Sequence, residues 1–119
     1  ELGGTCVNAG CVPKKLMYHA AEVAHALGDA ADYGFSLAGI RHDWAAFKSR
    51  RDAYVERLRG IYAENLARSG AALLRAPARL AGGGRVEIGG ETHAARHVVV
   101  ATGGRPSVPA VPGAELGIT

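Results

Sequence analysis

The distribution of glycine constrains the fold of this chain more than any other feature of its sequence. Glycine supplies 17 of the 119 residues, which is about twice its usual share in a soluble domain. The glycines gather near the two ends and between residues 82 and 90, whereas residues 13–27 contain none. The pattern is unusual for a self-contained domain and is typical of part of a cofactor-binding domain.

The apolar content is smaller in effect than the hydrophobic fraction of 48% suggests. Alanine supplies 23 residues, and only seven residues are aromatic. Because alanine buries little area, we expect a thin core. The chain begins at Glu1 and not at Met, so we expect it to be an internal piece of a larger protein.

Charge and hydropathy argue against two classes of partner. The 14 basic and 11 acidic residues give a net charge of +3, and the arginines alternate with Asp52, Glu56 and Glu64, as on an ordinary solvated helix face. We therefore expect no nucleic-acid partner. No apolar run reaches the roughly 18 residues of a membrane span, and no signal-peptide pattern is visible, so we expect a cytoplasmic protein without a membrane partner.

Residues 1–12 are predicted to form a Gly-rich loop, and two helices are predicted between this loop and the strand-like part of the chain. The first covers about 12–27, with Pro13 in its first turn and Gly28 as its stop. The second begins after Asp43, a good N-cap, and ends at Gly70. Its length of about 39 Å is long for a small domain, so we expect it to pack across a sheet or line an interface. Its apolar stripe contains Trp44, Phe47, Tyr54, Val55, Leu58, Ile61, Tyr62 and Leu66.

Short strands are predicted after Gly70. The dipeptide Gly89-Gly90 indicates a two-residue hairpin, and residues 82–84 form a further turn. The predicted short strands are Ala71–Arg75, Arg79–Ala81, Arg85–Ile88 and Glu91–Ala94.

The β-branched run His97–Ala101 differs from these short segments. A continuous apolar run of this kind is typical of a strand buried on both faces in a parallel sheet. Residues 105–119 carry three prolines and are expected to form an extended connecting segment.

Two cysteines carry the strongest chemical signal. Cys6 and Cys11 lie between Gly3 and Lys15 in a run that leads into the first predicted helix. A thiolate at Cys11 would face the positive end of that helix and its free N–H groups. Lys14 and Lys15 add positive charge in the first turn, where they oppose the helix dipole, and such a locally unfavourable choice suggests a function.

Several chemistries remain open from these residues alone. The cysteines could be small buried residues, or a structural disulfide, which a reducing compartment disfavours. A metal site would need two further ligands, and His19 and His25 do not share a helix face well. Redox chemistry is the fourth possibility.

The residues around the cysteines resemble the redox-active disulfide motif of the flavin-dependent pyridine nucleotide–disulfide oxidoreductases. The similarity includes the Gly-Gly-Thr lead, the cysteine spacing, Asn8, Gly10 and the Val-Pro-Lys-Lys exit. It departs at Ala9, where the family commonly has valine. Lys14, where several branches have serine, resembles the branch that reduces glutathione disulfide or the related trypanothione disulfide.

The resemblance extends over essentially the whole chain. The further similar segments are Asp32–Phe35, Arg50–Tyr54, Ile61-Tyr62, Asn65-Leu66, Ala101–Pro106 and Pro112–Thr119. It implies an α/β fold: a partial FAD-binding, Rossmann-like domain with two long helices, a small β-meander and a parallel-sheet strand. This domain would cover residues 1–104 without its N-terminal Gly-rich motif. Residues 105–119 would be a linker into an NADPH-binding domain outside the chain.

The resemblance also implies a reaction and a set of roles. The parent protein would reduce glutathione disulfide with NADPH, as a homodimer, through FAD and a Cys6–Cys11 disulfide, and the isolated chain would be inactive. Cys6 would attack the substrate, Cys11 would lie beside the flavin, and Lys14 would sit near the flavin N5. No metal is implied. The residues implied to contact FAD are Gly3, Gly4, Thr5, Cys6, Lys14, Ala78, Ala101, Thr102 and Gly103.

Ile61 and Tyr62 would face glutathione, although the apolar stripe alone would place Tyr62 in the core. Two other interpretations are retained. One is a related reductase for trypanothione or another disulfide. The other is a structural or interaction protein in which the cysteine pair is incidental.

Overall fold

The long helix predicted after Asp43 forms as α3, Trp44–Ser69, in a computed structural model that describes residues 1–117. The carboxylate of Asp43 accepts a hydrogen bond from the Ala46 N–H at 2.9 Å, which satisfies one of the free donors of the first turn. Gly70 adopts a left-handed conformation with φ 74° and ends the helix. Both predicted ends of the helix are thereby confirmed.

The first predicted helix is longer than expected. It forms as α2, Cys11–Asp29, and continues into a 3-10 turn, η1, Ala30–Tyr33. The prediction that Gly28 ends it is wrong. Gly28 lacks the positive φ of a helix stop, whereas Gly34 has φ 81° and closes the segment. A glycine inside a helix costs about 1 kcal/mol relative to alanine, which the helix tolerates here.

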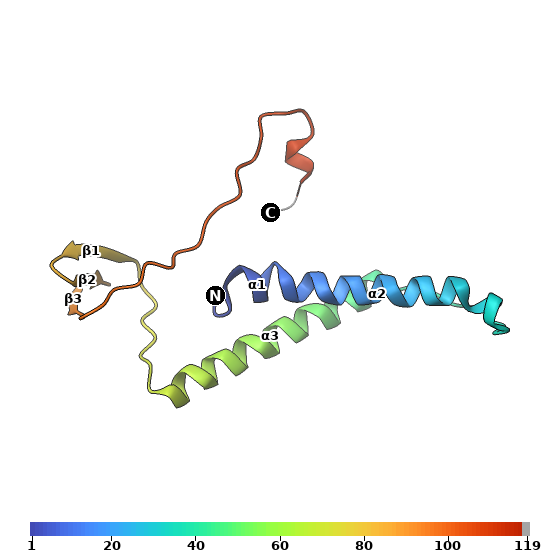
Figure 1. Cartoon of the computed structure of the whole chain (residues 1–119), viewed down its shortest axis with the longest axis horizontal. Coiled ribbons are helices and arrows are strands. Elements are labelled where there is room, and N and C mark those ends of the chain that lie inside the picture. The colour runs from blue at the N-terminus through green and yellow to red at the C-terminus, as the bar shows by residue number, and fades with distance from the viewer. Residues whose placement is uncertain (118–119) are drawn as a thin grey trace. The chain divides into compact units, whose positions relative to one another are not determined.

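A short helix, α1, occupies Gly4–Asn8, where the sequence predicted a loop. Helix α1 packs against α2 and α3, and α2 and α3 also contact each other (Figure 1). Val7 of α1 and Val55 of α3 are buried, with 4% and 6% of their surface exposed. These three helices belong to one compact unit, Glu1–Leu73.

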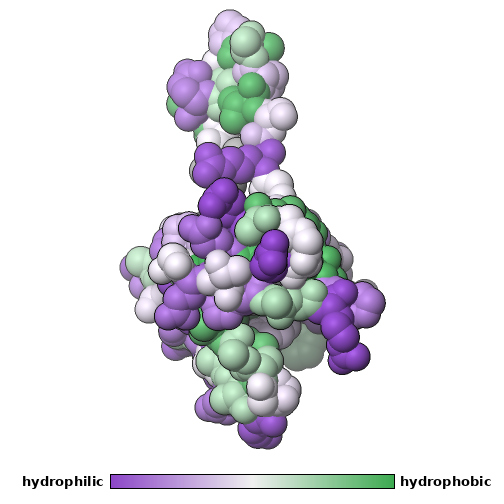
Figure 2. All heavy atoms as spheres, turned by 90° about the vertical axis from the view of Figure 1, so that its left-hand side faces the viewer, coloured by the Kyte–Doolittle hydropathy of each residue, from purple (hydrophilic) through white to green (hydrophobic). Residues whose placement is uncertain are grey.

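The core is thin, as the alanine content predicted. Within residues 1–117, large apolar side chains such as Val23, Trp44 and Tyr62 remain exposed. On the face drawn in Figure 2, hydrophobic and hydrophilic residues both lie at the surface. No helix in residues 1–117 combines the length and hydropathy that a bilayer crossing requires.

The second unit begins at Leu74 and contains a three-stranded antiparallel meander. Its strands are β1, Ala78–Gly82, β2, Arg85–Ile88, and β3, Glu91–Ala94, in the order β1-β2-β3. The predicted hairpin at Gly89-Gly90 is confirmed, and both glycines have positive φ, 59° and 91°, as a tight hairpin turn favours.

Two of the predicted strands are absent from the described residues. Ala71–Arg75 is irregular, and so is His97–Ala101, the expected parallel-sheet strand. A strand needs a neighbour to accept and donate its backbone hydrogen bonds, and no described segment pairs with His97–Ala101. Val99 is accordingly 86% exposed. The helical and antiparallel parts of the expected fold are present, and residues 1–117 contain no parallel strand pair.

The C-terminal segment is largely irregular, with a 3-10 turn, η2, at Ala114–Leu116. The last two residues of the predicted linker, 118 and 119, lie outside the described residues. The predicted domain boundary after residue 104 stays a prediction.

Candidate redox site

The two cysteines lie on successive helices separated by a tight turn. Cys6 is inside α1, and Cys11 is the first residue of α2. The two side chains are close enough for Cys11 to shift the pKa of Cys6. Both are exposed and carry free thiols. The arrangement therefore presents two neighbouring sulfur atoms to a reaction partner.

Gly10 allows this close approach. A Cβ at this position would lie 3.0 Å from the carbonyl oxygen of Thr5 and 3.4 Å from the Cα of Cys6. The carbonyl of Gly10 also accepts the N–H of Lys14 at 3.0 Å, which starts the hydrogen-bond ladder of α2. A side chain at residue 10 would push α1 and the start of α2 apart.

Gly3 and Gly4 shape the entry to α1. Gly3 has φ 88°, and a Cβ there would lie 2.5 Å from the Cβ of the buried Val7, so only glycine fits. Gly4 also has a positive φ, 57°, but no atom lies within 4 Å of the position of its absent Cβ. The backbone of Gly4 is therefore open to an approaching ligand.

The pair is electrostatically asymmetric. The hydrogen bond to the Cys11 side chain raises the pKa of Cys6, and partial loss of hydration and the negative charge of Cys11 act in the same direction. A backbone hydrogen bond at Cys11 and the positive charge of Lys14 lower this pKa, but they do not cancel the rise. The net effect of these groups is a pKa of Cys6 above its usual value.

A polar network that the sequence did not reveal holds the segment containing Cys6. The guanidinium of Arg59, on α3, donates to the Asn8 side-chain oxygen at 2.5 Å and to the Glu1 carboxylate at 2.7 Å. Arg59 is four residues after the buried Val55, which puts it on the same helix face. The spacing of four residues between Val55 and Arg59 was the only feature of the sequence that could have indicated this contact.

The structure brings together one part of the predicted site. The N-cap of α1, α1 itself and the first turn of α2 contain six of the predicted residues: Gly3, Gly4, Thr5, Cys6, Cys11 and Lys14. Ile61 and Tyr62 lie on α3 in the same unit, where Ile61 is half-buried and Tyr62 is exposed.

The other predicted cofactor residues lie in the second unit. Ala78 is the first residue of β1, and Ala101, Thr102 and Gly103 are exposed in the irregular segment after β3.

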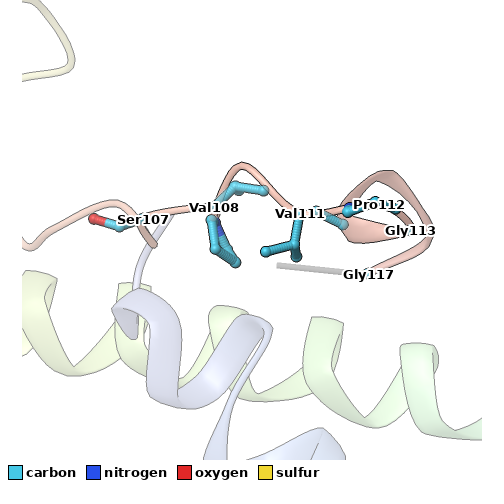
Figure 3. A pocket seen from close by; sticks show the side chains of 8 residues that line it. Ser107, Val108, Val111, Pro112, Gly113 and Gly117 are labelled. Carbon is cyan, nitrogen blue, oxygen red and sulfur yellow. The ribbon is translucent and has the colours of Figure 1, made fainter.

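Each of the two units contains an open hollow within residues 1–117. In the second unit, a hollow of about 330 Å³ is formed by the C-terminal loop, with Val108 and Val111 on its concave side (Figure 3). In the first unit, α2 and the start of α3 line a hollow of about 500 Å³ that includes Val23 and Phe47. Neither hollow contains a predicted site residue.

Comparison with known proteins agrees with the cysteine geometry. The family model described as pyridine nucleotide-disulphide oxidoreductase matches residues 1–119. A glutathione reductase of Yarrowia lipolytica is 43% identical over 131 aligned positions, which cover 98% of this chain and 28% of the relative. A glutathione reductase of Burkholderia cepacia is 39% identical over 119 positions, covering 100% and 26%. The chain thus spans about a quarter of the length of these curated relatives.

Proposed function

We propose that this chain, which belongs to the pyridine nucleotide-disulphide oxidoreductase family, carries the redox-active cysteine pair of an enzyme that reduces glutathione disulfide. The observation that carries the proposal is the placement of Cys6 and Cys11. They lie on two successive helices, Cys6 in α1 and Cys11 at the start of α2, and both remain exposed. A buried structural pair would be shielded from a substrate, whereas this pair is accessible.

The residues beside the cysteines fit a flavin. Gly4 leaves its backbone open, the first turn of α2 has free N–H groups, and Lys14 supplies a positive charge. Gly3, Gly4, Thr5 and Lys14 would hold the flavin here, with Ala78, Ala101, Thr102 and Gly103 as further proposed contacts. When bound, FAD would pass two electrons from NADPH to the cysteine pair.

The two thiols would act in sequence on the substrate. The Cys6 sulfur, once deprotonated, attacks one sulfur of glutathione disulfide, so that a mixed disulfide forms and one glutathione thiolate leaves and takes up a proton. The Cys11 thiolate then attacks the Cys6 sulfur and releases the second glutathione. The substrate disulfide is reduced to two thiols, and the cysteine pair is oxidised to one disulfide.

The electrostatics of the pair bear on how the attacking thiolate would form. The Cys11 side chain raises the pKa of Cys6 and so disfavours its thiolate. Lys14 favours the Cys6 thiolate and would help to form the nucleophile. Ile61 and Tyr62, on α3, are the proposed glutathione contacts.

The remaining features proposed for the whole enzyme rest on the family resemblance of the sequence. They are NADPH as the reductant, a homodimer and a cytoplasmic location. NADPH would bind outside this chain. A related reductase for trypanothione disulfide remains the alternative.

This function is tested by measuring the steady-state oxidation of NADPH by the complete gene product after it has been loaded with FAD. We expect turnover with glutathione disulfide to exceed turnover with trypanothione disulfide or lipoamide. Cys6→Ser and Cys11→Ser should each abolish it. Wild-type turnover in either variant would overturn the proposal, and a preference for trypanothione disulfide would establish the alternative.

A further inference from the structure

Arg59 makes a set of contacts that joins α3 to the segment around Cys6. Its Nε donates to Asn8 Oδ1 at 2.5 Å, one terminal nitrogen donates to Glu1 at 2.7 Å, and the other donates to Glu56 at 2.8 Å. Asn8 and Glu1 lie 51 and 58 residues away from Arg59 in the sequence, on either side of Cys6. One side chain therefore fixes both flanks of the cysteine.

Asn8 passes this restraint to the backbone of the same segment. Its side-chain amide donates to the carbonyl oxygens of Leu2 at 3.0 Å and Gly4 at 2.8 Å. The Asn8 side chain therefore both accepts from Arg59 and donates to the start of α1. Hydrogen bonds from a guanidinium are charge-assisted and directional, so this network restricts how α1 can rotate.

We propose that Arg59 is a positioning residue of the redox pair, which acts through Asn8 to hold the Cys6 sulfur where it can form a disulfide with Cys11. The inference rests on the proposed function of the two cysteines. Without Arg59, α1 gains freedom and the effective concentration of one thiol at the other falls. The thiols of the pair then become harder to oxidise to the disulfide.

Arg59 acts on Cys6 by holding its segment in place, and not by changing the pKa of its thiol. The side chains that shift the pKa of Cys6 are Cys11 and Lys14, whereas Arg59 reaches the segment through hydrogen bonds. Arg59 also directly precedes the Gly60-Ile61-Tyr62 stretch of α3. The helix segment proposed to contact glutathione is therefore the one that positions the attacking cysteine.

A glutathione redox buffer measures this positioning in the protein as its gene encodes it. The dithiol reacts with one glutathione disulfide to give the Cys6–Cys11 disulfide and two glutathione thiols, and mass spectrometry of the alkylated peptide gives the equilibrium constant. We expect Arg59→Met and Asn8→Ala each to lower this constant about tenfold, which corresponds to about 30 mV. The double variant should lower it no further, because both changes break one pathway.

The controls separate this inference from the proposed function. Arg57→Met removes an exposed arginine of the same helix and should leave the constant unchanged. If the disulfide equilibrium constant keeps its wild-type value in Arg59→Met and Asn8→Ala, or if their effects add in the double variant, the positioning role of Arg59 is refuted. The proposed function of the two cysteines would stand in either case. Failure of the wild-type protein to form the Cys6–Cys11 disulfide would overturn both proposals. If Arg59→Met does not fold, Asn8→Ala decides: an unchanged constant there refutes the inference.

Discussion

Gly10 is the residue on which the approach of the two cysteines depends most directly. Its missing side chain leaves room for the Thr5 carbonyl oxygen, which would lie 3.0 Å from a Cβ. That oxygen is backbone and accepts the Ala9 N–H at 2.9 Å, so it cannot move aside without disturbing α1. The geometry of the redox pair therefore depends on the absence of a side chain as much as on the two thiols.

Substituting two glycines by alanine separates this close-packing effect from helix propensity. Gly10→Ala should lower the equilibrium constant for the Cys6–Cys11 disulfide severalfold, because the turn must open. In Gly28→Ala, the new methyl group meets no atom within 4 Å, so the free energy of unfolding should rise by about 0.5–1 kcal/mol. Redox-buffer titration and urea unfolding measure the two quantities. An unchanged disulfide equilibrium in Gly10→Ala would contradict the packing argument.

The pKa of Cys6 should respond in opposite directions to the loss of Cys11 and to the loss of Lys14. Cys11→Ala should lower it, because the hydrogen bond and the negative charge that raise it are removed. Lys14→Gln should raise it further, because the ammonium that favours the thiolate is lost. The pH dependence of iodoacetamide alkylation of Cys6 reports both shifts, since only the thiolate reacts at an appreciable rate.

Lys15→Gln is the matched control for Lys14→Gln, because it removes the same charge one residue further along α2. We expect it to leave the alkylation midpoint of Cys6 in place. If both lysine variants shift the alkylation midpoint equally, the total positive charge of the segment controls the pKa of Cys6, and the specific position of Lys14 does not.

At the scale of elements, α3 depends on its N-cap. Asp43→Ala should lower the free energy of unfolding by about 1 kcal/mol, because the Ala46 N–H loses its acceptor. Asp43→Asn keeps an oxygen at that position and should lose much less. Urea unfolding followed by circular dichroism measures both variants. Equal losses would indicate that the charge of Asp43 matters and its hydrogen bond does not.

The elements that the sequence predicted well are those fixed by local signals. Asp43 and Gly70 bound α3, and Gly89-Gly90 makes the β2–β3 turn, each through contacts within a few residues. The strand at His97–Ala101 was predicted wrongly because strand pairing depends on a distant partner that a local pattern does not contain. The prediction that Gly28 ends the first helix was wrong for a related reason, because glycine permits a left-handed helix stop but does not require one.

The candidate site followed the same rule: its local part could be predicted from the sequence, and its long-range contacts could not. Cys6, Cys11 and Lys14 share one continuous motif, and the structure gathers them within α1 and the start of α2. The bond between Arg59 and Asn8 spans 51 residues, so no local pattern could reveal it. Only the position of Arg59 on the same helix face as Val55 hinted at a contact.

At the scale of the whole molecule, the exposed apolar surface has a functional consequence. Val7 and Val55 are buried, yet side chains such as Val99 and Tyr62 remain exposed. We expect the 119-residue chain on its own not to retain FAD, because little of it is packed around a common core. Gel filtration with added FAD, followed by the flavin absorbance of the protein peak, tests this. Co-elution of stoichiometric flavin would contradict it.

The central claim is that Cys6 attacks the substrate and Cys11 resolves the mixed disulfide. The most direct measurement compares Cys6→Ser with Cys11→Ser in the protein as its gene encodes it, after exposure of the reduced protein to stoichiometric glutathione disulfide. Mass spectrometry should find glutathione attached to Cys6 in Cys11→Ser, because the resolving thiol is missing, and little attached to Cys11 in Cys6→Ser. Equal attachment in both variants, or none in either, would contradict the account.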